Sequence, residues 1–302
     1  MYPKKSAARR AAWARSAGTI TVAGFAATLP VHALEVAAGD YEVVPAGVNL
    51  GMLYYQHATT SNLYVNGSKV SDNFKVQSDI ALFRYIRPVQ LGANTTLDLQ
   101  AILPSGRLRG SGDAAALGST SGFGDLILGA PVKFLLDPVS RDAISIGTYV
   151  YLPTGSYDSA KPLNLGENRW KALVQLAYVA HFGPRWALDT VGDVQLHGRN
   201  TSFGPGGSTR SQAARTELQT HLRYILSPQT ALSAGLGHYR GGQTKIDGVV
   251  QNDALRTTYA RLTATHFLDQ TNQLQVQWGQ DLSVHNGTKE HARINLRYVK
   301  IF

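Results

Sequence analysis

Apolar and polar residues alternate along this chain with a period of two. In residues 169–182, Trp170, Val174 and Leu176 fall on one face, whereas Lys171 and Gln175 fall on the other. Successive side chains of a β-strand point to opposite faces, so this alternation predicts a strand with one apolar face. Helical spacing would mix these positions and leave no clean apolar stripe.

The alternation recurs in about twelve segments, which we predict to be strands. Their ranges are 46–57, 73–87, 94–104, 122–136, 143–153, 169–182, 185–197, 213–227, 229–240, 254–268, 272–284 and 291–302. Short connections, several with proline, alternate with longer ones rich in Gly, Ser and Asn at 58–72, 105–121, 154–168, 198–212, 241–253 and 285–290. Short turns at one end and long loops at the other are typical of an outer-membrane barrel. We therefore predict an all-β fold, a transmembrane up-and-down antiparallel β-barrel.

A soluble periplasmic β-sandwich is the alternative, because its strands alternate as well. Sandwich strands usually have about 5–6 residues, whereas the segments here have 11–15. In hydrocarbon an open sheet edge has no hydrogen-bond partner, so a spanning sheet must close on itself. Segment length therefore favours the barrel.

The first 33 residues are expected to be a cleaved secretory signal peptide. A basic start over residues 1–15 is followed by an apolar stretch, Ser16 to Leu29, and by the small-x-small site at 31–33. A basic, amphipathic or disordered arm is the alternative. Cleavage there leaves residues 34–302 as the outer-membrane barrel, starting at Leu34.

Charge and composition exclude several classes of function. Five of the 29 basic residues and none of the 20 acidic ones lie in residues 1–33, so the net charge of +9 falls to +4 for the rest of the chain. This remaining charge is spread and partly cancelled, so nucleic-acid binding is not expected. The chain has no cysteine, which removes thiolate metal sites and cysteine nucleophiles. We predict no cofactor and no bound metal.

Polar residues of the strands are expected to face the lumen and to decide what passes. The inward set mixes both signs: Lys75, Gln77, Asp79, Asp98, Gln100, Asp125, Lys133, Lys171, Asp189, Asp193, Arg215, Glu217, His221, Arg223, Gln275, Gln277, Asp281, Arg293, Asn295 and Arg297. From this set the candidates for the lumen or its constriction are Asp125, Lys171, Asp189, Asp193, Arg215, Glu217, His221, Arg223, Gln275, Gln277 and Arg297. Twelve strands fall between filled eight-stranded barrels and open sixteen-stranded ones. We therefore expect the loops 105–121 and 154–168 to fold inward as a constriction.

The C-terminus ends on Phe302, in phase with the apolar residues Leu296 and Tyr298 of the last strand. This ending resembles that of outer-membrane barrels, whose terminal aromatic residue is read by the barrel-assembly machinery. Lys300 departs from the pattern, and its long side chain is expected to reach the interface.

Four short motifs occur in order, at 39–50 (GDYEVVPAGVNL), 121–126 (SGFGDL), 152–158 (LPTGSYD) and 164–170 (NLGENRW). Together they resemble the outer-membrane proteins associated with the meta pathway of phenol degradation. The resemblance implies a barrel in the bacterial outer membrane that admits small aromatic or other hydrophobic carbon compounds. The motif residues of interest are Gly122, Gly124, Asp125, Pro153, Thr154, Gly155, Gly166, Asn168, Arg169 and Trp170. We expect the glycines to have a structural role. Asp125 and Arg169 are either an ion pair in the lumen or ligands of the solute.

The function predicted is passive transport through a porin-like channel, with outer-membrane lipid and a small hydrophobic or aromatic solute as partners. A structural or adhesion barrel is one alternative, and a barrel hydrolase is another. The eight histidines after residue 33 fall in no recognisable catalytic or zinc motif, so we predict that the protein is not an enzyme.

Overall fold

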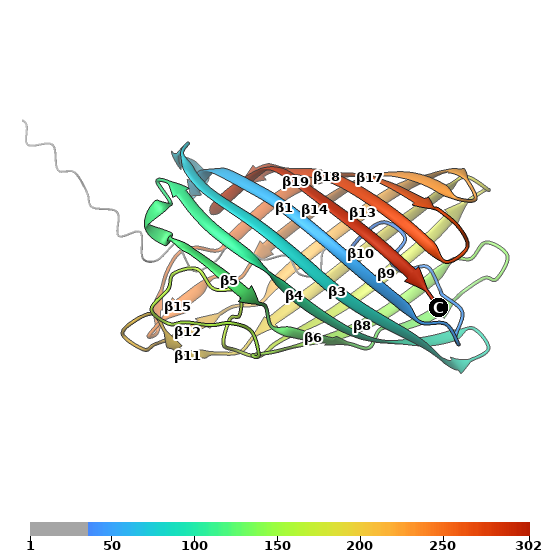
Figure 1. The fold of residues 1–302 in the computed structure, drawn as a ribbon, viewed down its shortest axis with the longest axis horizontal. Coiled ribbons are helices and arrows are strands. Elements are labelled where there is room, and N and C mark those ends of the chain that lie inside the picture. The colour runs from blue at the N-terminus through green and yellow to red at the C-terminus, as the bar shows by residue number, and fades with distance from the viewer. Residues whose placement is uncertain (1–35) are drawn as a thin grey trace, which may run out of the picture.

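Strand pairing runs in one closed circuit around the molecule (Figure 1). The computed structural model describes residues 36–302, so the predicted signal peptide, 1–33, lies outside the described residues. The first strand, β1 (Leu50–Val65), pairs antiparallel with the last, β19 (Gly287–Ile301), from Leu50 opposite Ile301 to Tyr64 opposite Gly287. This closure removes the sheet edges, as a bilayer requires, and excludes the sandwich.

The wall has twelve strands, which confirms the predicted fold. Between β1 and β19 they are, in order, β3 (Phe74–Gly92), β4 (Thr95–Gly112), a broken strand, β8 (Ala143–Leu152), β9 (Lys171–Phe182), β10 (Trp186–His197), β13 (Arg215–Ser227), β14 (Thr230–Gly241), β17 (Leu255–Phe267) and β18 (Asn272–Val284). The broken strand consists of β5 (Ser119–Phe123), β6 (Leu126–Gly129) and β7 (Val132–Leu135). Over residues 36–302, no helix is long and apolar enough to span a bilayer.

The outer surface of the wall is apolar and the inner surface is largely polar. Leu218, Leu236 and Leu262 point outward and are 58%, 53% and 55% exposed, whereas Asp189 and Gln219 are buried inside. This distribution is the inverse of that in a soluble protein, and outside β3 it matches the faces predicted from the alternation. The exposed side chains are those that contact lipid.

The two ends of the barrel differ, as the connection lengths predicted. The longer connections carry the hairpin strand β2 (Ser68–Ser71), the short helix η2 (Ala115–Leu117) and a separate small sheet of β11 (Asn200–Phe203), β12 (Ser208–Gln212), β15 (Thr244–Ile246) and β16 (Val249–Val250). They lie on the left in Figure 1, and the C-terminus lies at the opposite end. Long loops face outward in outer-membrane barrels, so we call these the extracellular end and the periplasmic end.

Two predictions about strands and loops are wrong in part. β4 continues to Gly112, so residues 105–112 belong to the wall and do not fold inward. The predicted strand 122–136 is interrupted after Phe123 and after Gly129. The wall stays hydrogen-bonded at both breaks, because Gly124 N–H donates to the Pro104 carbonyl at 2.8 Å and Asp98 N–H to the Pro131 carbonyl at 2.9 Å.

The extracellular half of β3 has the reverse orientation to the one predicted. Phe74, Val76 and Ile80 face inward and are buried, whereas Lys75 and Gln77 are exposed on the outer face. Asp79 shares that outer face, where it is half-buried. Even-numbered residues face inward along β3, and the hydropathy pattern is inverted in its extracellular half because protein covers the inward side chains there.

Substituting a lipid-facing residue near the middle of a strand tests the barrel. Leu236→Arg is expected to destabilise folding into phospholipid vesicles by about 2–4 kcal/mol, because the guanidinium must enter hydrocarbon. Denaturant titration of vesicle-inserted protein measures this change. Ser202→Arg, on the extracellular sheet, is the control and should leave stability unchanged; equal effects at both sites would contradict the assigned lipid face.

Candidate functional site: the occluded lumen

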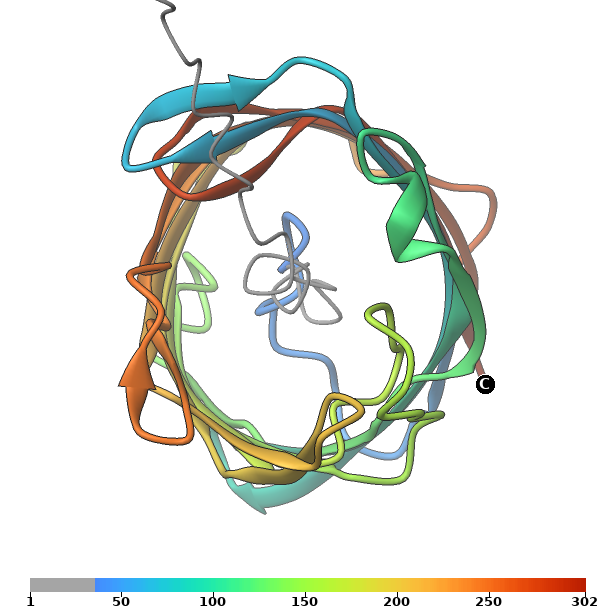
Figure 2. The same ribbon diagram turned by 90° about the vertical axis from the view of Figure 1, so that its left-hand side faces the viewer.

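The chain before β1 lies inside the barrel, as Figure 2 shows for the blue trace in the middle of the ring. We call residues 36–49 the N-terminal segment. Val36 and Tyr41 pack against Ala177, Val179 and Val191 on the inner wall. The lumen is therefore filled at this level by the protein's own chain.

Asp40 connects the N-terminal segment to two arginines of the wall. Its Oδ1 lies 2.5 Å from Nη1 of Arg297 on β19, and its Oδ2 lies 3.4 Å from Nη1 of Arg84 on β3. Burial opposes the charge of the carboxylate, but Arg297 and Arg84 outweigh it and hold the pKa of Asp40 below its ordinary value. Asp40 is therefore ionised at neutral pH.

Glu42 makes a second set of contacts on the other side of the lumen. Its Oε1 accepts from Arg223 Nη2 at 2.7 Å and lies 3.0 Å from His181 Nε2. Arg223 also pairs with Asp189 at 2.8 Å, and Asp189 accepts the Gly39 N–H at 2.8 Å. Burial raises the pKa of Glu42, but the effect of Arg223 and His181 is larger, so the pKa lies below its ordinary value.

The backbone of the N-terminal segment is held as well. Lys133 donates from Nζ to the carbonyls of Asp40 and Glu42 at 3.0 and 2.9 Å, and it pairs with Asp98 at 3.0 Å. We call the contacts of Asp40 and Glu42 with the wall the ionic latch. Of the lumen candidates, Arg223 and Arg297 belong to it, and Asp189 holds Arg223 and the Gly39 N–H beside it.

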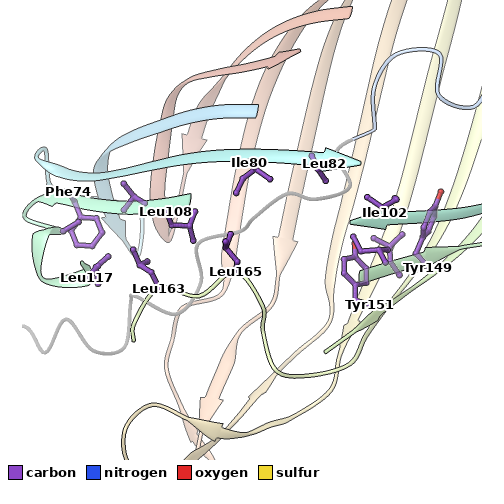
Figure 3. Packing of buried hydrophobic residues seen from close by; sticks show 14 residues of the cluster. Phe74, Ile80, Leu82, Ile102, Leu108, Leu117, Tyr149, Tyr151, Leu163 and Leu165 are labelled. Carbon is purple, nitrogen blue, oxygen red and sulfur yellow. The ribbon is translucent and has the colours of Figure 1, made fainter. Parts of the chain in front are cut away.

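A second obstruction comes from the connection between β8 and β9. We call residues 154–168 the inward loop, and the prediction that it folds into the barrel is confirmed (Figure 2). Leu163 and Leu165 are buried against inner-wall residues, beside Leu108 and Leu117 in Figure 3. The apolar cluster comprises Phe74, Val76, Ile80, Leu82, Ile102, Leu108, Ala114, Leu117, Ile127, Tyr149, Tyr151, Leu163, Leu165 and Leu173.

Asp125 fastens both ends of the inward loop. Its Oδ1 accepts the Gly155 N–H and its Oδ2 accepts the Glu167 N–H, both at 3.1 Å. Asp125 sits at the break between β5 and β6, where the wall is interrupted, and its side chain is 5% exposed. The carboxylate thus serves as a clamp rather than as a free lumen charge.

The motif glycines allow backbones to meet. A Cβ on Gly155 would lie 2.7 Å from the carbonyl carbon of Gly124 and 2.7 Å from Cα of Gly166. No real side chain fits at such distances, so glycine is required where the two ends of the inward loop cross the wall. Gly122 has φ +150°, and a Cβ there would lie 2.3 Å from Ser156 Oγ.

The structure does not pair Arg169 with Asp125. Arg169 instead binds Glu167, and Lys171 binds the same carboxylate. Burial opposes ionisation, but Lys171 and Arg169 bring the pKa of Glu167 well below its ordinary value. The cluster anchors the end of the inward loop.

The remaining motif residues shape the same region. Thr154 Oγ1 accepts a hydrogen bond from the Leu126 N–H at 3.1 Å. Pro153, the residue before Thr154, directly follows the end of β8 at Leu152. Asn168 adopts φ +51° and donates to Asn200 at 3.2 Å. Trp170 points outward and is 57% exposed, so it belongs to the lipid or interface surface and not to the lumen.

The other lumen candidates all face inward on the opposite wall. Glu217 Oε2 lies 3.7 Å from Arg215 Nη2, and Glu217 Oε1 accepts a hydrogen bond from the Tyr259 hydroxyl at 2.6 Å. Buried in the same half of the wall are Asp193, His221, Gln275 and Gln277. The lumen thus has an apolar side, formed mainly by β3, β4, β6 and β8, and a polar side, formed by β10 to β19.

Sequence reasoning missed the residues of the ionic latch. Asp40 and Glu42 lie in a quoted motif but received no role, and Arg84 was not among the inward candidates. No local pattern connects Asp40 and Glu42 with the wall, because their partners Arg84, Arg223 and Arg297 are distant in sequence. Within residues 36–302, no group of His, Asp and Glu side chains is arranged to hold a metal ion.

The fold and its contents can now be compared with known proteins. The family described as a putative MetA pathway of phenol degradation matches residues 60–298. The chain belongs to this family. It is 47% identical to an outer membrane channel from Pseudomonas putida F1, whose crystal structure superposes with a TM-score of 0.87 over 89% of this chain and 100% of that one. No curated relative matches the chain.

More distant structures share only the barrel. The beta domain of the Bordetella autotransporter BrkA is 10% identical with a TM-score of 0.51, over 85% of this chain and all of that one. The transport unit of the autotransporter AIDA-I from Escherichia coli is 6% identical, also with a TM-score of 0.51, over 89% of this chain and 92% of that one. Family membership and the close structure establish a bacterial outer-membrane channel.

Removing the clamp should free the inward loop. Asp125→Ala deletes two charge-assisted hydrogen bonds, each worth about 1.5–3 kcal/mol. Hydrogen–deuterium exchange at the amides of residues 155–168 is therefore expected to speed up by about tenfold or more. Asp137→Ala, which removes the same kind of bond from a periplasmic turn, is the control and should leave the loop protected. Unchanged exchange in Asp125→Ala would show that the apolar cluster alone holds the loop.

Proposed function

We propose that this channel mediates passive uptake of small aromatic or otherwise hydrophobic carbon compounds. The observation that carries the proposal is the apolar cluster inside the lumen. Pores for hydrophilic solutes have a polar interior, whereas here fourteen side chains, two of them on the inward loop, form an apolar cluster on one side of the lumen. Displacing the inward loop exposes that region to an entering solute.

The opposite wall supports the same kind of solute. Its acids and bases lie close together, as Glu217 does with Arg215 and Asp189 with Arg223. Opposite charges at such short range cancel the field that would select an ion of one sign. A molecule with an apolar body and a small uncharged polar group satisfies both sides of the lumen.

Two alternative functions are less well supported. The solved relative at 47% identity is a channel, and this argues against both a barrel hydrolase and a structural or adhesion barrel. The proposed partners are outer-membrane lipid, the transported solute and, during assembly, the barrel-assembly machinery through Phe302. The terminal phenyl ring is 62% exposed at the periplasmic end, where such a partner has access to it.

Uptake by cells tests the proposed function. Cells that produce the channel should take up a labelled alkylbenzene faster than cells that lack it, because the glycolipid leaflet of the outer membrane slows hydrophobic solutes. Liposome swelling with small uncharged solutes provides the purified counterpart. If the folded protein neither made liposomes permeable nor changed uptake by cells, the proposed uptake function would be wrong.

Neutralising the ionic latch should open the lumen. Asp40→Asn combined with Glu42→Gln removes charged bonds worth about 1.5–3 kcal/mol each, so the ratio of open to occluded channels is expected to rise by about tenfold or more. Planar-bilayer recordings measure this as higher mean conductance. Asp158→Asn, an exposed acid of the inward loop, is the control. Unaltered conductance in the double variant would mean that the N-terminal segment is held by other contacts.

A further inference from the structure

Two exposed arginines face each other on the outer wall at the extracellular end. Arg240, near the end of β14, lies directly opposite Arg256, near the start of β17. Both share the outward face of their strands with Leu236 and Leu262, which are 53% and 55% exposed. We call Arg240 and Arg256 the arginine pair.

The arginine pair is not explained by the fold itself. Like charges directly opposite each other destabilise an antiparallel sheet. Within residues 36–302, neither guanidinium forms a salt bridge, and Arg256 meets only a ring nitrogen of His285 at 3.1 Å. An anion between the two side chains would turn their repulsion into attraction.

The position of the arginine pair corresponds to lipid headgroups. On β14, Leu236 is the last outward leucine before Arg240, and His238 lies between them, bonded to Thr258 at 2.9 Å. Four residues of strand rise about 13 Å, reduced by the tilt of the strand, so the guanidiniums lie just beyond the apolar band. In the outer membrane, this level of the outer leaflet carries the phosphates of lipid A, a phosphorylated glycolipid.

A second cationic group lies beyond the apolar band on the other side of the barrel. Lys75, Arg107 and Arg109 are exposed on the outward faces of β3 and β4, beyond Leu103. The one acid among them, Asp79, lies opposite Arg107 in the ladder, and its carboxylate is engaged by the Tyr55 hydroxyl at 2.8 Å and by His57 at 2.7 Å. Cations beyond the apolar band on two sides of the barrel favour a ligand that surrounds it.

We propose that the arginine pair clamps a phosphate of an outer-leaflet glycolipid, and that Lys75, Arg107 and Arg109 form a second contact of the same kind. Guanidinium forks match phosphate oxygens in pairs of hydrogen bonds. Bound glycolipid would hold the leaflet against the wall around the extracellular end. The inference rests on the outer-membrane location and not on the identity of the transported solute.

The test is lipid binding by the full-length barrel, refolded in detergent so that no cellular lipid is carried over. Native mass spectrometry with bisphosphorylated lipid A should show adducts that are weakened about tenfold in R240Q/R256Q, the change expected from losing one or more charged hydrogen bonds. R87Q, an exposed arginine on the outward face of β3 at the periplasmic end, is the matched control and should bind as the unaltered protein does.

Two further measurements distinguish the glycolipid phosphate from free phosphate and from a purely structural role of the arginine pair. Dephosphorylated lipid A should bind the unaltered barrel as weakly as lipid A binds R240Q/R256Q, and inorganic phosphate alone should not raise the melting temperature as lipid A does. Without lipid, R240Q should melt no lower than the unaltered protein, because it loses a repulsive partner. Equal binding of phosphorylated and dephosphorylated lipid, stabilisation by phosphate alone, or a lower melting temperature of R240Q without lipid would each overturn the proposal.

Discussion

Hydrocarbon on the outside of the sheet is the constraint from which the rest of the structure follows. It forces the backbone bonds to close in a circuit and places leucines such as Leu218 outward. The same alternation then directs charged residues inward, where each needs a partner or water. Asp40 and Glu42 of the N-terminal segment supply partners for Arg297 and Arg223. Occlusion of the lumen is thus the counterpart of an apolar exterior.

The barrel was predictable because the bilayer imposes its period on the sequence. Lipid-facing positions such as Val174 and Leu176 have one environment along the whole span, and local alternation is enough to find them. Strand ends were less predictable, since ladders such as β4 continue beyond the membrane, where the alternation no longer has to match lipid. The inward face of β3 was not predictable for the same reason: Phe74 and Ile80 belong to one apolar cluster with Leu163 and Leu165, which are distant in sequence.

The ionic latch could not be inferred from local patterns. Asp40 and Arg297 are separated by 257 residues, and no spacing rule connects them. The motif glycines gave a partial signal. Their presence predicted a backbone constraint. At Gly124, Gly155 and Gly166 this constraint is the close approach of other segments of the chain, whereas among these motif glycines positive φ occurs at Gly122. The role of Asp125 as a clamp followed only from seeing both ends of the inward loop at one carboxylate.

The two obstructions differ in how they respond to water and to solute. In the ionic latch, hydration of the separated charges competes with the attraction between them, because the desolvation of both charges is reversed when water enters. If the N-terminal segment withdraws, water enters, Arg84 and Arg297 regain hydration, and Arg223 keeps Asp189 as a partner. Withdrawal therefore leaves no unpaired charge in a dry interior. The inward loop behaves differently, since exposing Leu163 and Leu165 to water is unfavourable unless an apolar solute takes their place. An apolar solute thus favours opening at the inward loop, whereas hydration permits opening at the ionic latch.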